Sequence, residues 1–396
     1  MEASLYVHVP LCSAGKCDYC DFYSVPVKPD SSLPDLFIET LLAEGEKLFE
    51  KFCQKSNDSL DRIPTIYIGG GTPSVLGSAG MLRLLNGLSR LVARISSPPE
   101  EIAIEANPET ADEAFLAAIR GGGATRLSLG VQTFCGPSRR AVRRAGDEAL
   151  LPGRLALAAE YFPASFSADL ISGLPLQSEN VLLDDVATLV SYKPVHVSLY
   201  ALTVKPGALP ALPCRDEADR LWLCGRDALE RAGYRQYEVS NFSLPGNESR
   251  HNIRYWRMQS WLALGPAASG TIINNGSGTG FRYTIPPDIS AWLAAGGSGF
   301  FKEPGLVPVT EELDAITLMK ETLLMGFRYL EGPDEDVFQR RFHRSIGEVI
   351  PKTLNAWRSR GLLQENKFAL SKEGLLFLDP FLLDAFQELD EMRLFS

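Results

Sequence analysis

Three cysteines near the N-terminus, Cys12, Cys17 and Cys20, have the spacing of ligands to a soft metal or an iron–sulfur cluster. Three thiolates on one short loop repel one another unless a metal or a cluster compensates their charge. A structural zinc site or an all-cysteine cluster needs four protein ligands, whereas three cysteines leave one iron of a 4Fe–4S cluster open to a ligand that is not protein. The count therefore favours an open-site 4Fe–4S cluster.

The cysteines alone leave two other centres open. His8 or Asp18 could complete a zinc site, and the C-x4-C-x2-C spacing also matches a plant-type 2Fe–2S cluster. The 2Fe–2S centre requires a further cysteine, for which Cys53 is the plausible position. Cys53 lies in an apolar run with the spacing of a helix face, which favours a packed thiol.

Composition places the chain among ordinary globular proteins. Its 396 residues are enough for two or three domains, and 45% are hydrophobic and 22% charged. Seven cysteines, three of them clustered, do not suit a disulfide framework and favour a reducing cytosol. We find no signal-peptide pattern and no uninterrupted apolar run of about 18 residues, so we expect a cytoplasmic protein without a membrane span.

The charge of the chain argues against nucleic acid as a partner. The formal net charge is −10 and the isoelectric point is near 5.1. An acidic protein repels the phosphate backbone unless it carries a local basic patch. The nearest candidate for such a patch is the run Arg139, Arg140, Arg143 and Arg144.

Short β-rich segments alternate with helical patterns along the first half of the chain. Segments with strand character lie at residues 5–9, 65–68, 101–105, 126–129, 166–171 and 195–200. Helical spacing lies between them, for example at residues 34–52, 81–92 and 114–119. This βαβα order predicts an α/β fold with a parallel sheet or barrel.

Residues suited to ligand binding follow the ends of these strands. The cysteine loop follows the first strand and the segment 69–73, Gly-Gly-Gly-Thr-Pro, follows the second, while Glu105, Gln132 and Asp169 end the next three. Ligands of parallel α/β folds gather beyond the carboxyl ends of the strands. Each feature alone fits a tight turn or a helix cap, but together they indicate a ligand site.

Residues 6–12 and 20–22 resemble radical S-adenosylmethionine proteins, in the branch that contains oxygen-independent coproporphyrinogen III oxidase and the HemW heme chaperones. The resemblance covers nearly the whole chain. It continues through residues 69–73, 105–108, 130–132, 169–175, 198–203, 233–242 and 251–256.

The resemblance implies a 4Fe–4S cluster on Cys12, Cys17 and Cys20, with the amino and carboxylate groups of S-adenosylmethionine on the fourth iron. Reduction would then cleave the sulfonium bond to a 5′-deoxyadenosyl radical. Glu105 and the glycine turn would receive the ammonium, Arg144 the carboxylate, and Gln132 and Asp169 the ribose hydroxyls. The residues implied for S-adenosylmethionine are Tyr6, Phe22, Gly70, Gly71, Thr72, Glu105, Gln132, Arg144 and Asp169, with Tyr6 against the sulfonium. The residues alone favour a solvated helix arginine at Arg144.

Two differences assign the chain to the chaperone side of this branch. The oxidase pattern has a fourth cysteine where this chain has Phe22, and it has an N-terminal extension where only eleven residues precede Cys12 here. The His-Asn-x-x-Tyr-Trp motif of the chaperones is intact. Through it the resemblance implies heme binding, with His251 as axial ligand and Tyr255 and Trp256 against the macrocycle. From the residues alone, a histidine that bonds the backbone stays open for His251.

The chain departs from the family pattern in two places. Four residues separate Cys12 from Cys17, where most members of the branch have three, and Gly15 is the residue that could absorb the extra position as a bulge. Ser269 stands where the family usually has a histidine, which removes a second candidate iron ligand. We therefore expect His251 to be the heme ligand if either residue is.

The expected architecture is a partial (β/α)6 barrel at residues 1–215, an α+β extension with the His-Asn-x-x-Tyr-Trp motif at 216–310, and a winged-helix-like module at 311–396. The resemblance implies a heme chaperone that passes heme to acceptor proteins, with respiratory membrane complexes as candidates and peripheral membrane contact left open. It also implies an electron donor for the cluster. The alternatives are coproporphyrinogen III oxidation, and a cluster that serves only structure or regulation. The oligomeric state stays open.

Overall fold

A computed structural model describes residues 1–13, 15–28, 30–52, 60–95, 97–203, 209, 212–299 and 304–393. Twelve strands form one mixed sheet in the order β14-β13-β12-β11-β1-β4-β5-β6-β7-β8-β10-β9. Its centre consists of six parallel neighbours: β1 (Ser4–Val9), β4 (Thr65–Gly70), β5 (Glu101–Ala106), β6 (Arg126–Gln132), β7 (Phe166–Ser172) and β8 (His196–Ala201). All six correspond to the strands predicted from the sequence. Cys53, the proposed packed thiol, lies outside the described residues.

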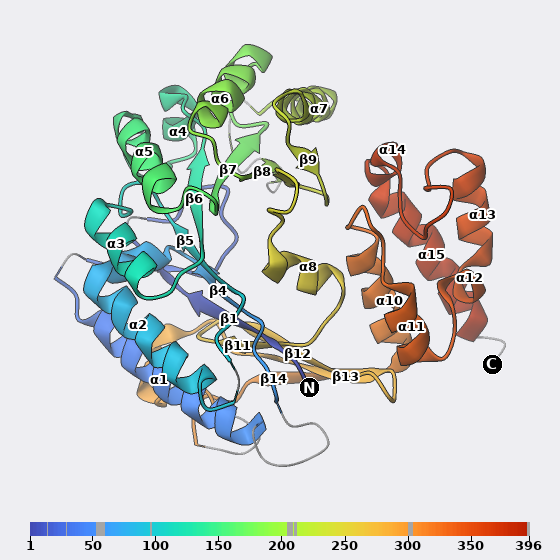
Figure 1. Ribbon diagram of the computed structural model, residues 1–396, viewed down its shortest axis with the longest axis horizontal. Coiled ribbons are helices and arrows are strands. Elements are labelled where there is room, and N and C mark those ends of the chain that lie inside the picture. Colours follow the sequence, from blue (N-terminus) through green and yellow to red (C-terminus); the bar gives the residue numbers. More distant parts are fainter. Residues whose placement is uncertain are drawn as a thin grey trace.

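Helices cover the outer face of the six parallel strands (Figure 1). They follow the strands in βα order: α1 (Leu33–Phe52), α2 (Gly77–Val92), α3 (Glu113–Gly121), α4 (Gly136–Ala141), α5 (Leu151–Tyr161), α6 (Glu179–Ser191) and α7 (Arg215–Arg231), with short 3-10 turns η1 (Pro73–Leu76) and η2 (Glu148–Leu150). Side-chain caps mark helix starts, such as Asp112 before α3 and Ser178 before α6. The helices at 34–52, 81–92 and 114–119 are confirmed within a few residues.

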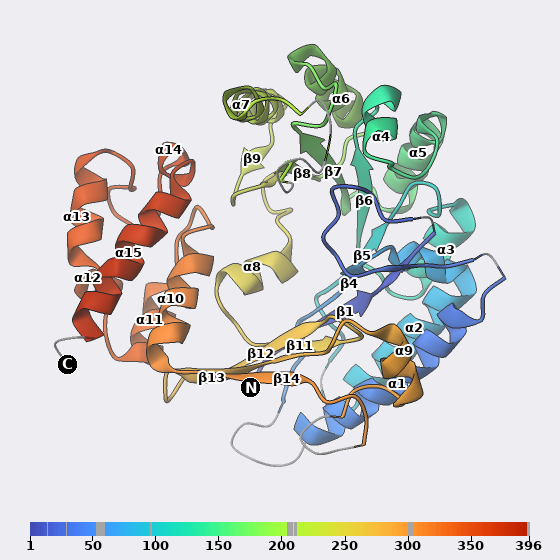
Figure 2. The same ribbon diagram turned by 180° about the vertical axis from the view of Figure 1, so that it is seen from behind.

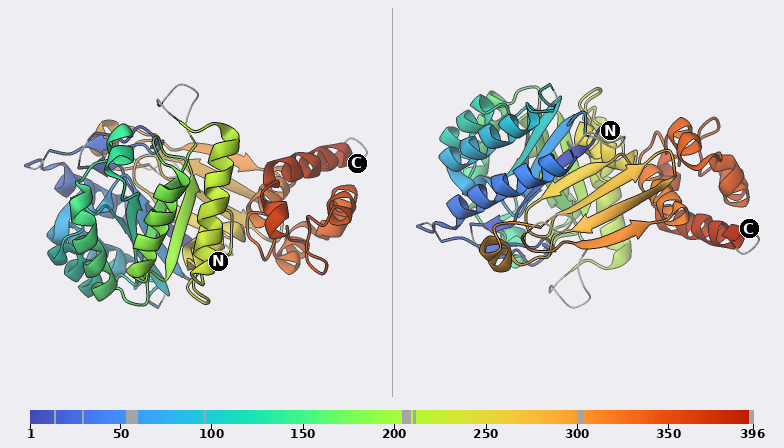
Figure 3. Two further views of the ribbon diagram at one scale, coloured as in Figure 1. Left: turned by 90° about the horizontal axis from the view of Figure 1, so that it is seen from above. Right: turned by 90° about the horizontal axis from the view of Figure 1, so that it is seen from below.

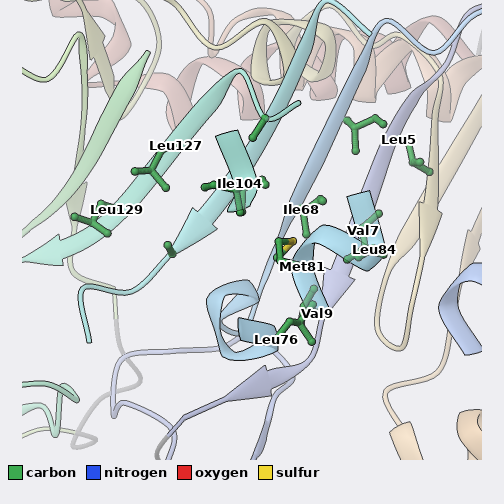
Figure 4. Close-up of a cluster of buried hydrophobic side chains, with 14 of the residues drawn as sticks. Leu5, Val7, Val9, Ile68, Leu76, Met81, Leu84, Ile104, Leu127 and Leu129 are labelled. Carbon is green, nitrogen blue, oxygen red and sulfur yellow. The ribbon is translucent and has the colours of Figure 1, made fainter. Parts of the chain in front are cut away.

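The strands alternate between an apolar outer face and a polar inner face. In β1, Leu5, Val7 and Val9 are fully buried, and Figure 4 shows them on the same side as Met81 and Leu84 of α2. Successive side chains of a strand point to opposite faces, so the residues between them, such as Tyr6, face inward. The same alternation in the neighbouring strands produces a polar interior.

The second half of the chain extends the sheet at both edges. β9 (Arg235–Gln236) and β10 (Asn241–Ser243) continue beyond β8, while β11 (Trp261–Leu264) pairs in parallel with β1. β12 (Ser269–Asn274), β13 (Thr279–Thr284) and β14 (Val309–Leu313) follow as antiparallel neighbours (Figure 3). Along the chain, α9 (Ile289–Ala294) connects β13 to β14. The two outer strands of the parallel set, β1 and β8, pair with β11 and β10 and not with each other. The six parallel strands therefore form an open, partial barrel.

The C-terminal segment forms a helical module beside the sheet (Figure 2). Its helices are α10 (Ala315–Gly326), α11 (Glu335–Phe342), α12 (Ile346–Val349), α13 (Pro351–Ser359), α14 (Lys372–Leu375) and α15 (Leu378–Arg393). The predicted hairpin is a single antiparallel bridge between Leu363 and Leu370, and two further helices follow it. A core of its own, with Trp357 packed edge-on against Phe381, stabilises the module. The division at residues 215 and 310 stays a prediction, and the second boundary falls inside β14.

Candidate functional site

A cavity of about 450 Å³ lies at the carboxyl ends of the six parallel strands. The cysteine loop, the turn after β4 and the ends of β5 to β8 enclose it. It brings together eleven of the predicted residues: Cys12, Cys17, Cys20, Phe22, Gly70, Gly71, Thr72, Glu105, Gln132, Arg144 and Asp169. Tyr6 and the His-Asn-x-x-Tyr-Trp residues are not among the residues that line this cavity.

The cysteine loop is closed at its base by a short pairing of β2 (Leu11–Cys12) with β3 (Val25–Pro26). The N–H of Cys20 donates to the carbonyl of Cys17 at 3.1 Å, and the Thr72 hydroxyl donates to Sγ of Cys12 at 3.7 Å. Gly15 stands in open space, so nothing nearby restricts the extra residue of this loop. Burial raises the pKa of the Cys20 thiol, which a metal must offset to bind it as thiolate.

The residues suggested for a zinc site are engaged elsewhere. The His8 ring bonds the Tyr6 hydroxyl at 2.9 Å and the Tyr23 carbonyl at 3.1 Å, and Asp18 pairs with Arg143. Within the described ranges, no three His, Cys, Asp or Glu side chains converge closely enough to hold one metal ion. Ligands of a cluster bind different irons and stand farther apart than the ligands of a single ion.

The glycine turn after β4 packs directly onto the base of the cysteine loop. A Cβ at Gly71 would lie 2.6 Å from the carbonyl oxygen of Leu11, and one at Gly70, where φ is +109°, would lie 2.5 Å from Nδ1 of His8. The N–H of Gly71 donates to the Val9 carbonyl at 2.8 Å. Glycine is therefore required here for close packing, whatever else the turn contacts.

Two carboxyl groups face the cavity from neighbouring parts of the sheet. Glu105 accepts hydrogen bonds from the Tyr67 hydroxyl at 2.5 Å and from the Gly70 N–H at 3.2 Å. Burial raises its pKa to about 7, and the nearby charge of Asp169 adds to the shift. Burial also raises the pKa of Asp169 to about 6, although the Ser128 hydroxyl donates to it at 3.3 Å. A raised pKa means that the ionised carboxylate is less well stabilised in the fold than it would be in water.

Arg144 joins the ends of β5 and β6 beside these carboxyls. Its Nη2 donates to Oδ1 of Asn107 at 2.8 Å and to the carbonyl of Gly130 at 2.6 Å. Gln132 follows in a positive-φ conformation (71°), where the register between β6 and β7 shifts. A non-glycine residue in that conformation is strained, which is typical of functional sites.

The predicted basic patch does not form. Arg139 is buried, and its guanidinium donates to the carbonyls of Val131, Thr133 and Ala145. Arg144 lines the cavity, so the interpretation of a solvated helix arginine is wrong for it. Two of the four arginines therefore serve the loop and the cavity instead of the outer surface.

Phe22 and Tyr6 differ in their relation to the cavity. Phe22 lines it and is 57% exposed, which leaves its ring free to contact a bound molecule. Tyr6 lies behind the wall, with its ring 6.3 Å from that of Tyr67 and its hydroxyl bonded to His8. A contact between Tyr6 and a ligand stays a prediction.

The His-Asn-x-x-Tyr-Trp motif lies on α8 (Arg250–Trp256), at the opposite end of the strands from the cavity. His251 is 1% exposed, and both of its ring nitrogens are engaged: Nδ1 with the Thr65 hydroxyl at 2.8 Å and Nε2 with the Tyr255 hydroxyl at 3.1 Å. Burial lowers the pKa of His251 to about 3, so the ring is neutral. Heme ligation by His251 would require one ring nitrogen to exchange its hydrogen-bond partner for iron.

Comparison with known proteins places this architecture in a family. Residues 6–188 match the radical SAM superfamily. The heme chaperone HemW of Haemophilus influenzae is 33% identical over 96% of this chain and 96% of its own length, and that of Lactococcus lactis is 31% identical over 89% of each. The chain belongs to the HemW family. The mitochondrial radical S-adenosyl methionine domain-containing protein 1 of Bos taurus is 32% identical over 96% of this chain and 82% of that protein.

A solved structure confirms the predicted fold class for this HemW family member. The coproporphyrinogen III oxidase HemN of Escherichia coli superposes with a TM-score of 0.79 at 19% identity, over 97% of this chain and 90% of that one. The shared architecture is the α/β radical SAM fold. None of the helices within the described residues is long and apolar enough to cross a membrane.

The radical SAM family implies a 4Fe–4S cluster and S-adenosylmethionine, and the cavity residues of this HemW family member fit both. Three thiols face one cavity, and none of them forms a disulfide. Buried polar atoms beside them, Nε of Arg144 and Oε1 of Gln132, have no hydrogen-bond partner among the described residues. Buried donors and acceptors without partners are costly unless a ligand satisfies them. A polar, charged ligand such as S-adenosylmethionine supplies such partners.

Three residues that the site uses were not among those predicted from the sequence. Asn107 supports Arg144, Tyr67 holds Glu105, and Tyr200 lines the cavity with 43% of its surface exposed. Asn107 and Tyr200 lie inside segments that carried the family resemblance, so that resemblance could have found them. Tyr67 could have been found from strand alternation alone, because it lies two residues before the inward-facing Gly69.

Proposed function

We propose that the protein is a heme chaperone that binds heme and transfers it to acceptor proteins, while holding a 4Fe–4S cluster and S-adenosylmethionine. The similarity to several proteins named heme chaperone HemW, at 31–33% identity over most of the chain, carries this proposal. Phe22 supports it, because the oxidase pattern places a fourth cysteine at that position.

Cys12, Cys17 and Cys20 are proposed to hold the cluster and to leave one iron for S-adenosylmethionine. When bound, this cofactor pair supplies one-electron reductive cleavage of the sulfonium bond. The chain's part is to exclude water and to fix the ligand's orientation. Phe22 beside the cysteines and the glycine turn at the base of their loop form the walls on which that orientation depends.

The polar residues of the cavity are proposed to bind the ammonium, carboxylate and ribose groups of S-adenosylmethionine. Glu105 is proposed to receive the ammonium, because a carboxyl with a raised pKa gains most from a nearby cation. Arg144 is proposed to receive the carboxylate, for which its unpartnered Nε is a donor. Gln132 and Asp169 are proposed to accept the ribose hydroxyls, and Gly70, Gly71 and Thr72 to line the ligand.

The proposed heme site is the His-Asn-x-x-Tyr-Trp motif on α8. The family motif predicts His251, Tyr255 and Trp256 as the heme-binding residues. The contacts of α8 show which interactions heme binding would have to break. The ligating nitrogen would have to leave Thr65 or Tyr255, and the ring is 1% exposed. Heme at this motif therefore requires α8 to open, and it stays a prediction.

Oxygen-independent coproporphyrinogen III oxidation is the second candidate function. The E. coli oxidase shares the fold, with a TM-score of 0.79, and at 19% identity that likeness shows the fold alone. The third alternative, a cluster and S-adenosylmethionine used only for structure or regulation, would release no 5′-deoxyadenosine during heme transfer. Heme acceptors, among them respiratory membrane complexes, an electron donor and a cytoplasmic location with or without membrane contact remain predictions.

The first experiment is a titration of anaerobically reconstituted protein with heme, followed by the Soret absorbance. We expect saturation near one heme per chain. Coproporphyrinogen and S-adenosylmethionine are supplied to the same protein with a reductant in a parallel assay. Absence of heme binding together with formation of protoporphyrinogen would refute the chaperone function and establish the oxidase.

A further inference from the structure

Helix α8 closes the amino end of the partial barrel, opposite the cofactor cavity. Its contacts go to the first residues of three adjacent strands: Ser4 of β1, Thr65 of β4 and Glu101 of β5. The N–H of His251 donates to the Glu101 carboxylate at 2.9 Å, and Nε of Arg254 donates to the Ser4 hydroxyl at 2.7 Å. The helix therefore forms the floor of the barrel interior.

The His251 ring is the part of this floor that reaches toward the cavity. It packs against the Tyr67 ring, with centroids 5.1 Å apart and an interplanar angle of 31°. The hydrogen bonds to Thr65 and Tyr255 fix the orientation of the imidazole. The Tyr67 hydroxyl in turn donates to Oε1 of Glu105 at 2.5 Å. One chain of contacts thus leads from His251 through Tyr67 to the cavity carboxylate.

We propose that His251 is a positioning residue for the S-adenosylmethionine site, acting through Tyr67 on Glu105. The inference rests on the proposed role of Glu105 as acceptor of the ammonium. Two rings pack against Tyr67, that of Tyr6 at 6.3 Å and that of His251 at 5.1 Å between centroids, and His251, the closer one, holds Tyr67 from the floor. Without the imidazole, Tyr67 gains room to turn away, and the Gly70 N–H is then the remaining donor to Glu105 among the hydrogen bonds of the described structure.

The chain contains a second histidine that serves as a matched control. His196 begins β8 and is 3% exposed, with Nδ1 2.7 Å from the Ser167 hydroxyl and Nε2 2.9 Å from the Tyr237 hydroxyl. Its ring neighbour is Tyr237, at 5.7 Å between centroids. In the described part of the chain, none of its hydrogen bonds or ring contacts involves Tyr67 or Glu105. His196 therefore matches His251 in burial and bonding but not in its connection to the cavity.

The test compares the S-adenosylmethionine affinity of the wild type, His251→Ala, His251→Phe and His196→Ala. Each is the full chain with its cluster, and the dissociation constant is measured by equilibrium dialysis and by the change that S-adenosylmethionine causes in the electron paramagnetic resonance spectrum of the reduced cluster. We expect His251→Ala to weaken binding about tenfold, the lower end of what loss of an outer-shell partner costs at metal sites. His251→Phe keeps a flat ring against Tyr67 and should stay within about threefold. His196→Ala should bind like the wild type.

Thermal unfolding of the same samples measures the stability that each substitution removes. Unchanged affinity in His251→Ala would overturn the proposal, and so would an equal loss in His196→Ala, which would indicate general loosening of the barrel. If His251→Ala does not fold, Tyr67→Phe tests the same series of contacts without leaving a cavity beneath the barrel. Normal affinity in Tyr67→Phe would also overturn the proposal. A wild type that fails to bind heme would refute the chaperone function, yet the affinities for S-adenosylmethionine would still decide the role of His251.

Discussion

Replacing Glu105 with glutamine removes the charge of the side chain and nearly keeps its shape. We expect Glu105→Gln to stabilise the protein free of S-adenosylmethionine and to weaken the binding of that ligand. Burial raises the pKa of Glu105 from 4.5 to about 7. Because the folded state binds this proton more tightly than the unfolded chain does, the proton's stabilising contribution is complete below the unfolded pKa and is lost as the pH rises through about 7.

The size of the effect follows from the same interval. A rise in pKa from 4.5 to about 7 corresponds to about 3 kcal/mol of unfolding free energy that the wild type loses by pH 8. Glutamine does not ionise, and its amide oxygen can still accept the hydrogen bond from Tyr67. The variant should therefore keep most of this free energy, and its advantage over the wild type should grow from pH 5.5 to pH 8.

The assay is anaerobic thermal unfolding of cluster-loaded protein without S-adenosylmethionine at both pH values, with the wild type and Glu105→Gln side by side. Dialysis with S-adenosylmethionine then measures affinity, which should fall about 10-fold or more, the worth of a hydrogen bond to a charged group. An advantage that is equal at pH 5.5 and pH 8 would refute the assignment of a buried, uncompensated carboxylate. Unchanged affinity would refute the contact with the ammonium.

Three further predictions concern the cluster loop and the C-terminal module. Gly71→Ala places a Cβ 2.6 Å from the Leu11 carbonyl oxygen and should lower the unfolding free energy by about 1–3 kcal/mol and reduce the iron content. Gly15→Ala, with open space around it, should change neither. Thermal unfolding and iron analysis of both variants check this. Cys20→Ser should leave far less than about four irons per chain after reconstitution, and full iron content would remove Cys20 from the ligand set. Trp357→Ala should cost about 3–5 kcal/mol, because the ring is 1% exposed, yet leave S-adenosylmethionine affinity unchanged; a large loss of affinity would contradict separate cores.

The parallel half of the fold was predictable because its signals are local. Each of the six strands is a short apolar or β-branched run between helical segments. That pattern can be recognised in the sequence without knowing which strands pair. β13 was not predicted, since Thr279–Thr284 is partly exposed over most of its length and reads as a turn-rich segment. It pairs with β12 and β14, and β12 joins the parallel strands only through β11, which pairs with β1. Such pairing is tertiary information.

The cavity was predictable to the extent that strand ends define it. Glu105 and Gln132 lie at the ends of β5 and β6, and Asp169 lies within the neighbouring β7, so the topology brings the three together although Asp169 does not end its strand as predicted. Arg144 was not predictable from its neighbours, because four arginines in one run read as a solvated surface. The hydrogen bonds of Arg139 to backbone carbonyls turn that arginine inward, while Arg140 and Arg143 stay exposed, and no periodicity in the sequence indicates this.

His251 shows what a motif leaves undetermined. The sequence names the imidazole but not its neighbours, and in the fold it is packed and bonded much as His196 is. If His251 ligates heme, it must leave Tyr67, so heme and S-adenosylmethionine would weaken each other by the same factor, because coupling of two bound ligands is reciprocal. Heme titrations with and without saturating S-adenosylmethionine measure that factor. A shift of about tenfold in heme affinity, absent in His251→Phe, would place heme on His251. Independent binding would place heme elsewhere and leave His251 to the floor of the barrel.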